Sequence, residues 1–309
     1  MINKWARRLG LAIGFVLFLS QIVQAILSIS SSPLRMVWGW IFLAFLAMFL
    51  LIALQIFIWK HILNAMGIPL EYLQIARGYS LSLIPRYIPG GVWGYLNRSE
   101  WLKEAYQIPA SQGNLSSVLE VLQIVLTAFM ALFLFAGLFS NPPLPGFLMV
   151  VFLTLLLPFL VWKMLSLPVI QQNKWLPFQI HLPDGLLAGY AGVLQWVLLG
   201  ISTIFLLFGV QSGSVFGLLT LQKSALIAFC YTFSWLAGFF VLFIPGGMGI
   251  REVSLSFLLT QLVNVPAGQS AWIAVLSRLL YSLAELLWIL IALILGSGAR
   301  AGEEQTRKG

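Results

Sequence analysis

Residues 36–59 have the sequence MVWGWIFLAFLAMFLLIALQIFIW, which contains no charged side chain. A helix of about 20 consecutive apolar residues crosses the ~30 Å hydrocarbon core of a bilayer, so this run predicts a transmembrane helix. The whole chain shares this bias, because 60% of its 309 residues are hydrophobic and only 8% are charged, against about 25% in soluble domains. We therefore predict one integral membrane domain over residues 1–309, an all-α transmembrane bundle with no stretch polar enough for a separate catalytic domain.

Several further runs have the same character. The seven predicted spans are 9–29, 36–59, 121–139, 146–162, 185–210, 224–244 and 271–295. The first follows basic residues, as a signal peptide does, but its apolar part is longer than a typical signal sequence and no small-residue cleavage site follows it. We therefore expect an uncleaved anchor. Two other segments, 72–89 and 253–265, are too polar or too short for a plain span and favour re-entrant or interfacial structure.

The lysines and arginines predict the orientation, because short cytoplasmic loops are enriched in them. They are concentrated before the first span and in the connection 60–115, as Lys4, Arg7, Arg8, Lys60, Arg77, Arg86, Arg98 and Lys103. We expect both segments, including the amino-terminal residues 1–8, on the cytoplasmic face of the plasma membrane. The polar tail 296–309 is also basic, and placing it in the cytoplasm requires residues 250–265 to cross as well. About eight crossings result.

Two stretches of the sequence resemble each other. Residues 87–94 are YIPGGVWG and residues 243–249 are FIPGGMG, and each is followed by an arginine with an acid close by. Farther on, SVLEVL at 117–122 resembles SLAELL at 282–287. Transporters often contain such duplications, with the binding site where the Gly/Pro-interrupted segments of the two halves meet. The chain therefore contains a degenerate internal repeat with two PGG-containing broken segments, the second within residues 243–266.

A Pro-Gly-Gly sequence interrupts a helix, because proline lacks an N–H donor and glycine adopts conformations that other residues avoid. In lipid, the freed backbone groups must be buried in protein or face a wet cavity. If a helix restarts after the glycines, its first amides favour an anion, and Arg98 or Arg251 would add positive charge. A phosphodiester headgroup is the expected ligand. The alternative is that both motifs are tight turns at the cytoplasmic surface, with arginines that reach lipid headgroups.

The last apolar run carries Arg278 and Glu285, seven residues apart and nearly on one helix face. Their separation along the axis is about 10 Å, too far for direct pairing. Ionised residues in hydrocarbon normally face the bundle interior or water, so we expect partners elsewhere, with Glu120, Arg251 and Glu252 as candidates. The alternative is that Arg278 reaches the membrane surface and Glu285 has a structural role.

Metal and redox chemistry have little support in the sequence. The single cysteine, Cys230, lies in an apolar run and cannot form an intrachain disulfide. The two histidines, His61 and His181, are far apart without acids or cysteines at ligand spacing, so we interpret them as loop residues at the membrane surface. We expect no cofactor and no metal. The net charge of +8 sits in short loops beside apolar runs, which argues for anionic headgroups as partners and against nucleic acid.

These motifs resemble the membrane region of lysylphosphatidylglycerol synthases, also called the flippase-like family. The resemblance rests on PGG at 89–91 with Gly94 and Arg98, on PGGMGIRE at 245–252, and on SRLLY at 277–281. It implies a membrane bundle that, in bifunctional members, moves aminoacylated phospholipid between leaflets. Those members continue into a soluble aminoacyltransferase domain; with only a short polar tail after the last span, synthase activity is not expected here. Some stand-alone relatives accompany glycosyltransferases or isoprenoid metabolism.

We therefore expect a lipid translocase rather than an enzyme. It would move an anionic, aminoacylated or polyprenyl-phosphate headgroup through a charge-lined cavity, without ATP hydrolysis, since the sequence contains no GxxxxGK[ST] motif. The alternatives are an accessory subunit that partners a lipid-modifying enzyme or glycosyltransferase, and an intramembrane lipid transferase. The candidate substrate-binding residues are Pro89, Gly90, Gly91, Arg98, Glu120, Pro245, Gly246, Gly247, Arg251, Glu252, Arg278 and Glu285.

Overall fold

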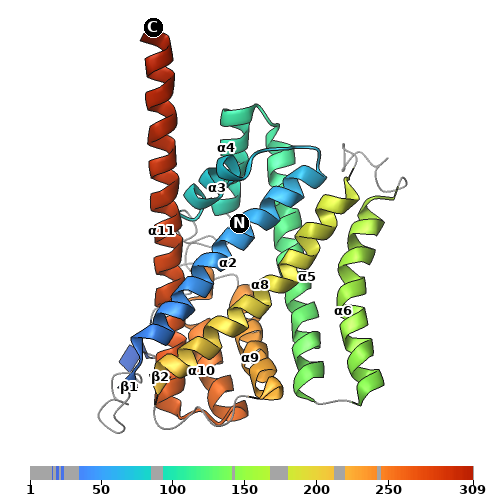
Figure 1. The fold of residues 1–309 in the computed structure, drawn as a ribbon, viewed down its shortest axis with the longest axis vertical. Helices are drawn as coiled ribbons and strands as arrows, with labels where there is room; N and C mark the ends of the chain where they lie inside the picture. The colour runs from blue at the N-terminus through green and yellow to red at the C-terminus, as the bar shows by residue number, and fades with distance from the viewer. Residues whose placement is uncertain are drawn as a thin grey trace.

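The computed structural model describes residues 35–84, 93–140, 143–167, 180–211, 220–241 and 245–308, together with residues 16, 19, 20, 22 and 23. These parts of the chain are almost entirely helical (Figure 1). The helices are α2 (Trp38–Ala65), α3 (Tyr72–Leu81), α4 (Trp93–Tyr106), α5 (Ala110–Phe139), α6 (Leu144–Leu165), α8 (Leu182–Gly209), α9 (Leu221–Phe240), the 3-10 turn η2 (Pro245–Gly247), α10 (Ile250–Leu262) and α11 (Ala267–Lys308). Two short strands, β1 (Arg35–Met36) and β2 (Val210–Gln211), pair with each other.

The predicted bundle is confirmed. Within the described ranges, six helices are long and apolar enough to cross a membrane: α2, α5, α6, α8, α9 and residues 267–294 of α11. Each coincides with a predicted span, and the multi-pass architecture follows. The remaining predicted span, 9–29, lies outside the described residues except at five positions.

Helices α2 and α8 run antiparallel and are joined at both ends. At one end β1 pairs with β2, and the N–H of Val37 donates to the carbonyl of Gly209 at 2.8 Å. At the other end the N–H of His181 donates to the carbonyl of Ala65 at 2.9 Å. The residue before each helix therefore donates to the last residue of the other helix. This reciprocal pattern is what a twofold relation between two halves of the chain produces.

The rest of the fold repeats this relation. Each of α2 and α8 has 28 residues, and each is followed by two helices that flank a PGG motif and then by a long apolar helix, α5 or α11. In Figure 1 the helices α3 and α4 lie in the upper part of the bundle, whereas α9 and α10 lie at its lower end, and α5 descends where α11 ascends. The duplication expected from the sequence is therefore an inverted repeat, with α6 in the connection between its halves.

Small residues on α8 allow its neighbours to approach closely. A Cβ atom on Gly189 would lie 3.0 Å from the side chain of Pro158 on α6, and one on Gly192 would lie 2.9 Å from Thr127 on α5. Gly185 lies directly against the indole of Trp162. The stripe of glycines on α8 therefore serves helix packing.

The interpretation of both histidines as loop residues at the membrane surface is wrong for His61, which lies within α2, whereas His181 is the exposed residue before α8. Both His61 and His181 place Nδ1 2.6 Å from a carboxylate oxygen of the same residue, Asp184, and Asn64 donates to that carboxylate at 3.3 Å. His61 is largely buried, whereas the side chain of His181 is 62% exposed. The sequence interval between the histidines hides their proximity because the antiparallel packing of α2 on α8 brings them together. Within the described residues, no group of three or more histidine, cysteine, aspartate or glutamate side chains is placed to hold a metal ion.

Candidate functional site

The second PGG motif forms the tip of a helical hairpin made by α9 and α10. Gly246, Gly247 and Gly249 have φ angles of 59°, 66° and 82°, a region that glycine adopts without steric penalty. A Cβ atom on Gly247 would lie 2.7 Å from the carbonyl oxygen of Gly238 on α9, so the turn packs backbone to backbone on that helix. The motif therefore needs glycine for both conformation and space.

This tip lies deep in the bundle. A Cβ atom on Gly246 would lie 2.9 Å from Nη2 of Arg278, and Arg278 is near the middle of the Ala267–Ile294 span of α11. Helix α10 begins at Ile250, as expected, but its 13 residues reach only about 20 Å at 1.5 Å per residue. Unlike α9, α10 is not long enough to cross the membrane, so it does not supply the crossing expected for residues 250–265. The α9–α10 hairpin instead places its tip against the middle of a spanning helix.

Glu252 holds the start of α10 in place. Its Oε2 accepts the N–H of Gly249 at 2.6 Å, and its Oε1 lies 3.8 Å from Nε of Arg278. The carboxylate is 2% exposed. Among the partners expected for Arg278, the structure selects Glu252, and this ion pair connects the hairpin tip to α11.

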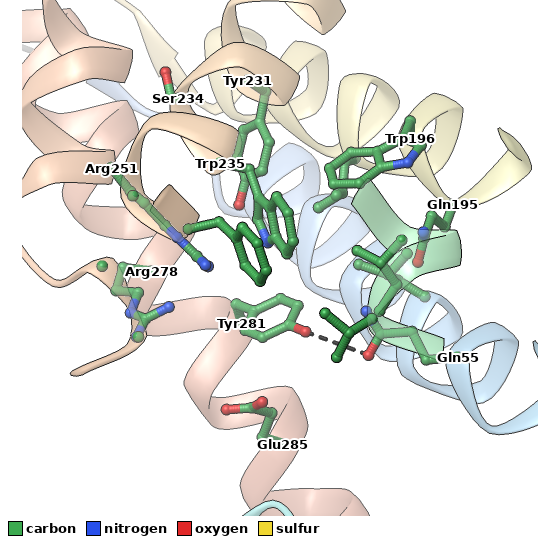
Figure 2. A pocket seen from close by; sticks show the side chains of 18 of the residues that line it. Gln55, Gln195, Trp196, Tyr231, Ser234, Trp235, Arg251, Arg278, Tyr281 and Glu285 are labelled. Atoms are coloured by element: carbon green, nitrogen blue, oxygen red, sulfur yellow. Dashed lines mark hydrogen bonds between the residues drawn. The ribbon is translucent and has the colours of Figure 1, made fainter. Parts of the chain in front are cut away.

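Arg251 extends from α10 toward a cavity (Figure 2). Its guanidinium carbon lies 4.9 Å from the centre of the Trp235 ring, a cation–π contact, and its side chain lies against Gly238. Its Nε is buried and, in the described part of the chain, has no hydrogen-bond partner. A buried donor without a partner is unfavourable, and the Arg251 side chain lines the cavity, so this residue is a candidate for binding a ligand.

The cavity has a volume of about 710 Å³ and is lined by residues of α2, α3, α4, α5, α8, α9, α10 and α11. One end carries Arg251, Arg278, Glu252 and Glu285, and the walls include Trp196, Trp235 and several aliphatic side chains. Figure 2 shows Tyr281 and Glu285 on successive turns of α11, beyond Arg278. Both signs of charge therefore meet an otherwise apolar space, which suits a charged headgroup attached to acyl chains.

The first half of the repeat contains a second charged cluster. Arg98 on α4 is fully buried; its Nε donates to Oγ of Ser82 at 2.7 Å and its Nη1 forms an ion pair with Oε2 of Glu120 on α5. Its guanidinium carbon lies 3.9 Å from the Tyr79 ring centre and 5.0 Å from that of Trp59. Glu120, expected as a partner for the charges on the last span, is instead paired within its own half.

The two clusters are built alike. Tyr79 and Trp235 each precede the proline of their PGG motif by ten residues (89 − 79 and 245 − 235), and each stacks on the arginine of its half. Ser82 and Gly238 each precede the proline of their own motif by seven residues. Ser82 contacts Arg98, and Gly238 contacts Arg251. The arginines themselves differ by three positions, close to one helical turn. The inverted repeat therefore extends to the functional side chains.

A hydrogen-bonded bridge connects the clusters. Oε1 of Gln55 on α2 accepts from the hydroxyls of Tyr79 at 3.3 Å and Tyr281 at 3.4 Å; Figure 2 shows the contact with Tyr281. The Tyr79 hydroxyl also lies 3.1 Å from Oε1 of Glu120. Sequence reasoning missed Gln55, Tyr79 and Tyr281. One available signal was the glutamine, which is the one strongly polar side chain in residues 36–59.

The structure thus brings together Gly246, Gly247, Arg251, Glu252, Arg278 and Glu285, with Pro245 in the same 3-10 turn, and places Arg98 and Glu120 behind Tyr79. The remaining candidates, Pro89, Gly90 and Gly91, lie outside the described residues.

These features define a multi-pass helical membrane protein with an inverted duplication and a charge-lined internal cavity. The chain matches the family described as the lysylphosphatidylglycerol synthase TM region over residues 5–292, and it therefore belongs to that family. No curated protein and no solved structure matches the chain.

Proposed function

We propose that this protein moves a phosphate-bearing lipid headgroup between the leaflets of the plasma membrane, without catalysing a chemical reaction. The headgroup enters the cavity between α5, α9, α10 and α11, while its acyl chains remain in the bilayer. The observation that carries this proposal is the side chain of Arg251, which lines the cavity and whose buried Nε has no hydrogen-bond partner in the described protein. A phosphate oxygen satisfies such a donor and neutralises the guanidinium charge.

The neighbouring groups support the same ligand class. Glu252 contacts the N–H of Gly249 and lies 3.8 Å from Nε of Arg278. Glu285 lines the same cavity and can accept a proton or an ammonium group of the headgroup, as intramembrane carboxylates commonly do. Transport is then downhill or ion-coupled. The amino terminus lies in the cytoplasm in this proposal. The protein alternates between two states, and the hairpin tip is open to one leaflet in each.

The test is leaflet transfer by the full chain in phosphatidylglycerol vesicles. Fluorescent phosphatidylglycerol, aminoacylated phosphatidylglycerol and a short polyprenyl phosphate serve as separate tracers, and a membrane-impermeant quencher reports exchange. We expect transfer of at least one tracer, and a loss of about tenfold or more for Arg251→Gln, equivalent to 1.4 kcal/mol of binding. Arg35→Gln is the matched control. Arg35 is an exposed residue of β1, and its substitution removes the same charge outside the cavity.

Two outcomes would overturn the proposal. Folded protein that moves none of the three tracers would favour an accessory subunit of a lipid-modifying enzyme or glycosyltransferase. A covalently altered tracer, detected by mass spectrometry of the extracted lipids, would favour an intramembrane transferase.

A further inference from the structure

We propose that the Arg98–Glu120 pair is a second site for the same headgroup phosphate, closed in this state by Glu120 and separated from the cavity by the Tyr79–Gln55–Tyr281 bridge. This inference rests on the proposed function, because it concerns the path of the same ligand. It assigns the phosphate two stations, one in each half of the inverted repeat.

The two arginine sites have the same kinds of neighbours. Arg98 and Arg251 each stack on an aromatic ring supplied ten residues before the corresponding PGG proline, and each touches the residue three positions after that ring. At Arg251 the anion position is open to the cavity. At Arg98 it is occupied by the Glu120 carboxylate, which also accepts the Tyr79 hydroxyl. A carboxylate inside the protein thus takes the place that a phosphate oxygen takes in the other half.

The cavity reaches close to the Arg98 site. The cavity extends from Arg251 to Tyr79, Asn114 and Ser117, and Ser117 lies three residues before Glu120 on α5, on the same helix face. Tyr79 lines the cavity, and its ring centre lies 3.9 Å from the guanidinium carbon of Arg98, so this side chain touches both the cavity and the Arg98 site. Rotation of Tyr79, whose single hydroxyl proton is donated to either Gln55 or Glu120, would therefore join the cavity to the Arg98 site.

Energetics determine when this opening occurs. Separating a fully buried ion pair leaves two uncompensated charges, so Arg98 does not release Glu120 into an empty space. A phosphate that arrives at Arg98 compensates the guanidinium, and Glu120 is neutralised when it takes up a proton. The exchange therefore requires the ligand, which prevents an open path without cargo. The two stations belong to opposite halves of the inverted repeat, and α3 and α4 lie toward the opposite end of the bundle from α9 and α10 (Figure 1).

The test is the stoichiometry of lipid binding. Dihexanoyl phosphatidylglycerol is titrated calorimetrically into the full chain in detergent, for the wild type and for Glu120→Gln, which imitates a protonated carboxyl group. We expect one equivalent in the wild type, lost in Arg251→Gln, and a second equivalent in Glu120→Gln that disappears in Arg98→Gln/Glu120→Gln. Glu100→Gln is the matched control, since it removes the same charge from an exposed position of α4 and should add no site.

Each result separates the proposals. A wild type that binds no lipid through Arg251 refutes the proposed function. A wild type that binds one equivalent, with a folded Glu120→Gln that also binds only one, refutes the second station alone. If Glu120→Gln does not fold, Glu120→Met also removes the carboxylate at a similar side-chain length, and it should give the same second equivalent.

A third arm identifies the source of the phosphate. Glycerol phosphate without acyl chains should bind the second station at least about tenfold more weakly than the lipid, a difference of 1.4 kcal/mol. Equal affinity of the two probes would assign the station to a soluble phosphate ester and overturn its role in lipid movement.

Discussion

Gly238 lies directly beneath the side chain of Arg251, so that a Cβ atom on Gly238 would collide with the arginine at its Cγ and would lie 2.9 Å from Nε. The glycine therefore leaves room for the Arg251 side chain beside the Trp235 ring at the cavity wall. In the other half of the repeat, the corresponding residue is Ser82, which holds Arg98 by a hydrogen bond. The same position is thus used for space at one arginine and for polar contact at the other.

Gly238→Ala should weaken lipid binding without unfolding the protein. The added methyl group displaces Arg251 from the Trp235 face, and we expect affinity for dihexanoyl phosphatidylglycerol to fall about tenfold, or 1.4 kcal/mol. Gly39→Ala is the control, because Gly39 is also helical but has no atom within 4 Å of the new Cβ. Calorimetric titration measures the affinity, and an unchanged value for Gly238→Ala would show that Arg251 does not bind the ligand in this position.

Gly247→Ala should disrupt the hairpin tip more than its backbone angle alone explains. The left-handed conformation costs about 1–2 kcal/mol for alanine, and the Cβ atom would also meet the Gly238 carbonyl oxygen at 2.7 Å. Gly67→Ala isolates the first contribution, since Gly67 has φ 76° with no atom within 4 Å of the new Cβ. Thermal unfolding in detergent compares the two, and equal destabilisation would contradict the backbone contact.

Arg98→Ala should be strongly destabilising, because it leaves the Glu120 carboxylate buried without its cation. Breaking such a pair typically lowers the free energy of unfolding by about 3–5 kcal/mol. Replacing both residues, as in Arg98→Met/Glu120→Met, should recover most of the loss, since no buried charge remains. The check is chemical unfolding of the two variants. A double variant as unstable as the single one would mean that packing between Tyr79 and Trp59, rather than charge, holds this region together.

Asp184→Ala should loosen the junction between α2 and α8. It removes two short contacts with His61 and His181 and one with Asn64, and hydrogen bonds to a charged group contribute about 1.5–3 kcal/mol each. His181→Ala should have an effect of at most about 1 kcal/mol, because exposed pairs contribute little. Thermal unfolding ranks them, and similar losses for both variants would refute a central role for the buried His61–Asp184 contact.

Much of this architecture follows from the sequence alone. The apolar runs fix where the spanning helices lie, because an uncharged stretch of this length has no other stable place than a bilayer or a fully buried core. The paired PGG motifs also reveal the duplication and the broken segments, since Pro and Gly restrict the backbone locally. Arg251, Arg278 and Glu285 follow as inward-facing residues from the high free energy of a charge in hydrocarbon.

Only the tertiary structure decided which of these residues meet. Helices such as α2 are apolar on the lipid side as well as on the core side, so their hydrophobic pattern does not indicate which face is buried. The pairing of Arg98 with Glu120 rather than with another acid, the acceptance of two tyrosine hydroxyls by Gln55, and the meeting of His61 with His181 on Asp184 all depend on helix packing. The sequence alone determined the helices and the residues that cannot face lipid, whereas the packing of the inverted halves determined the cavity that those residues share.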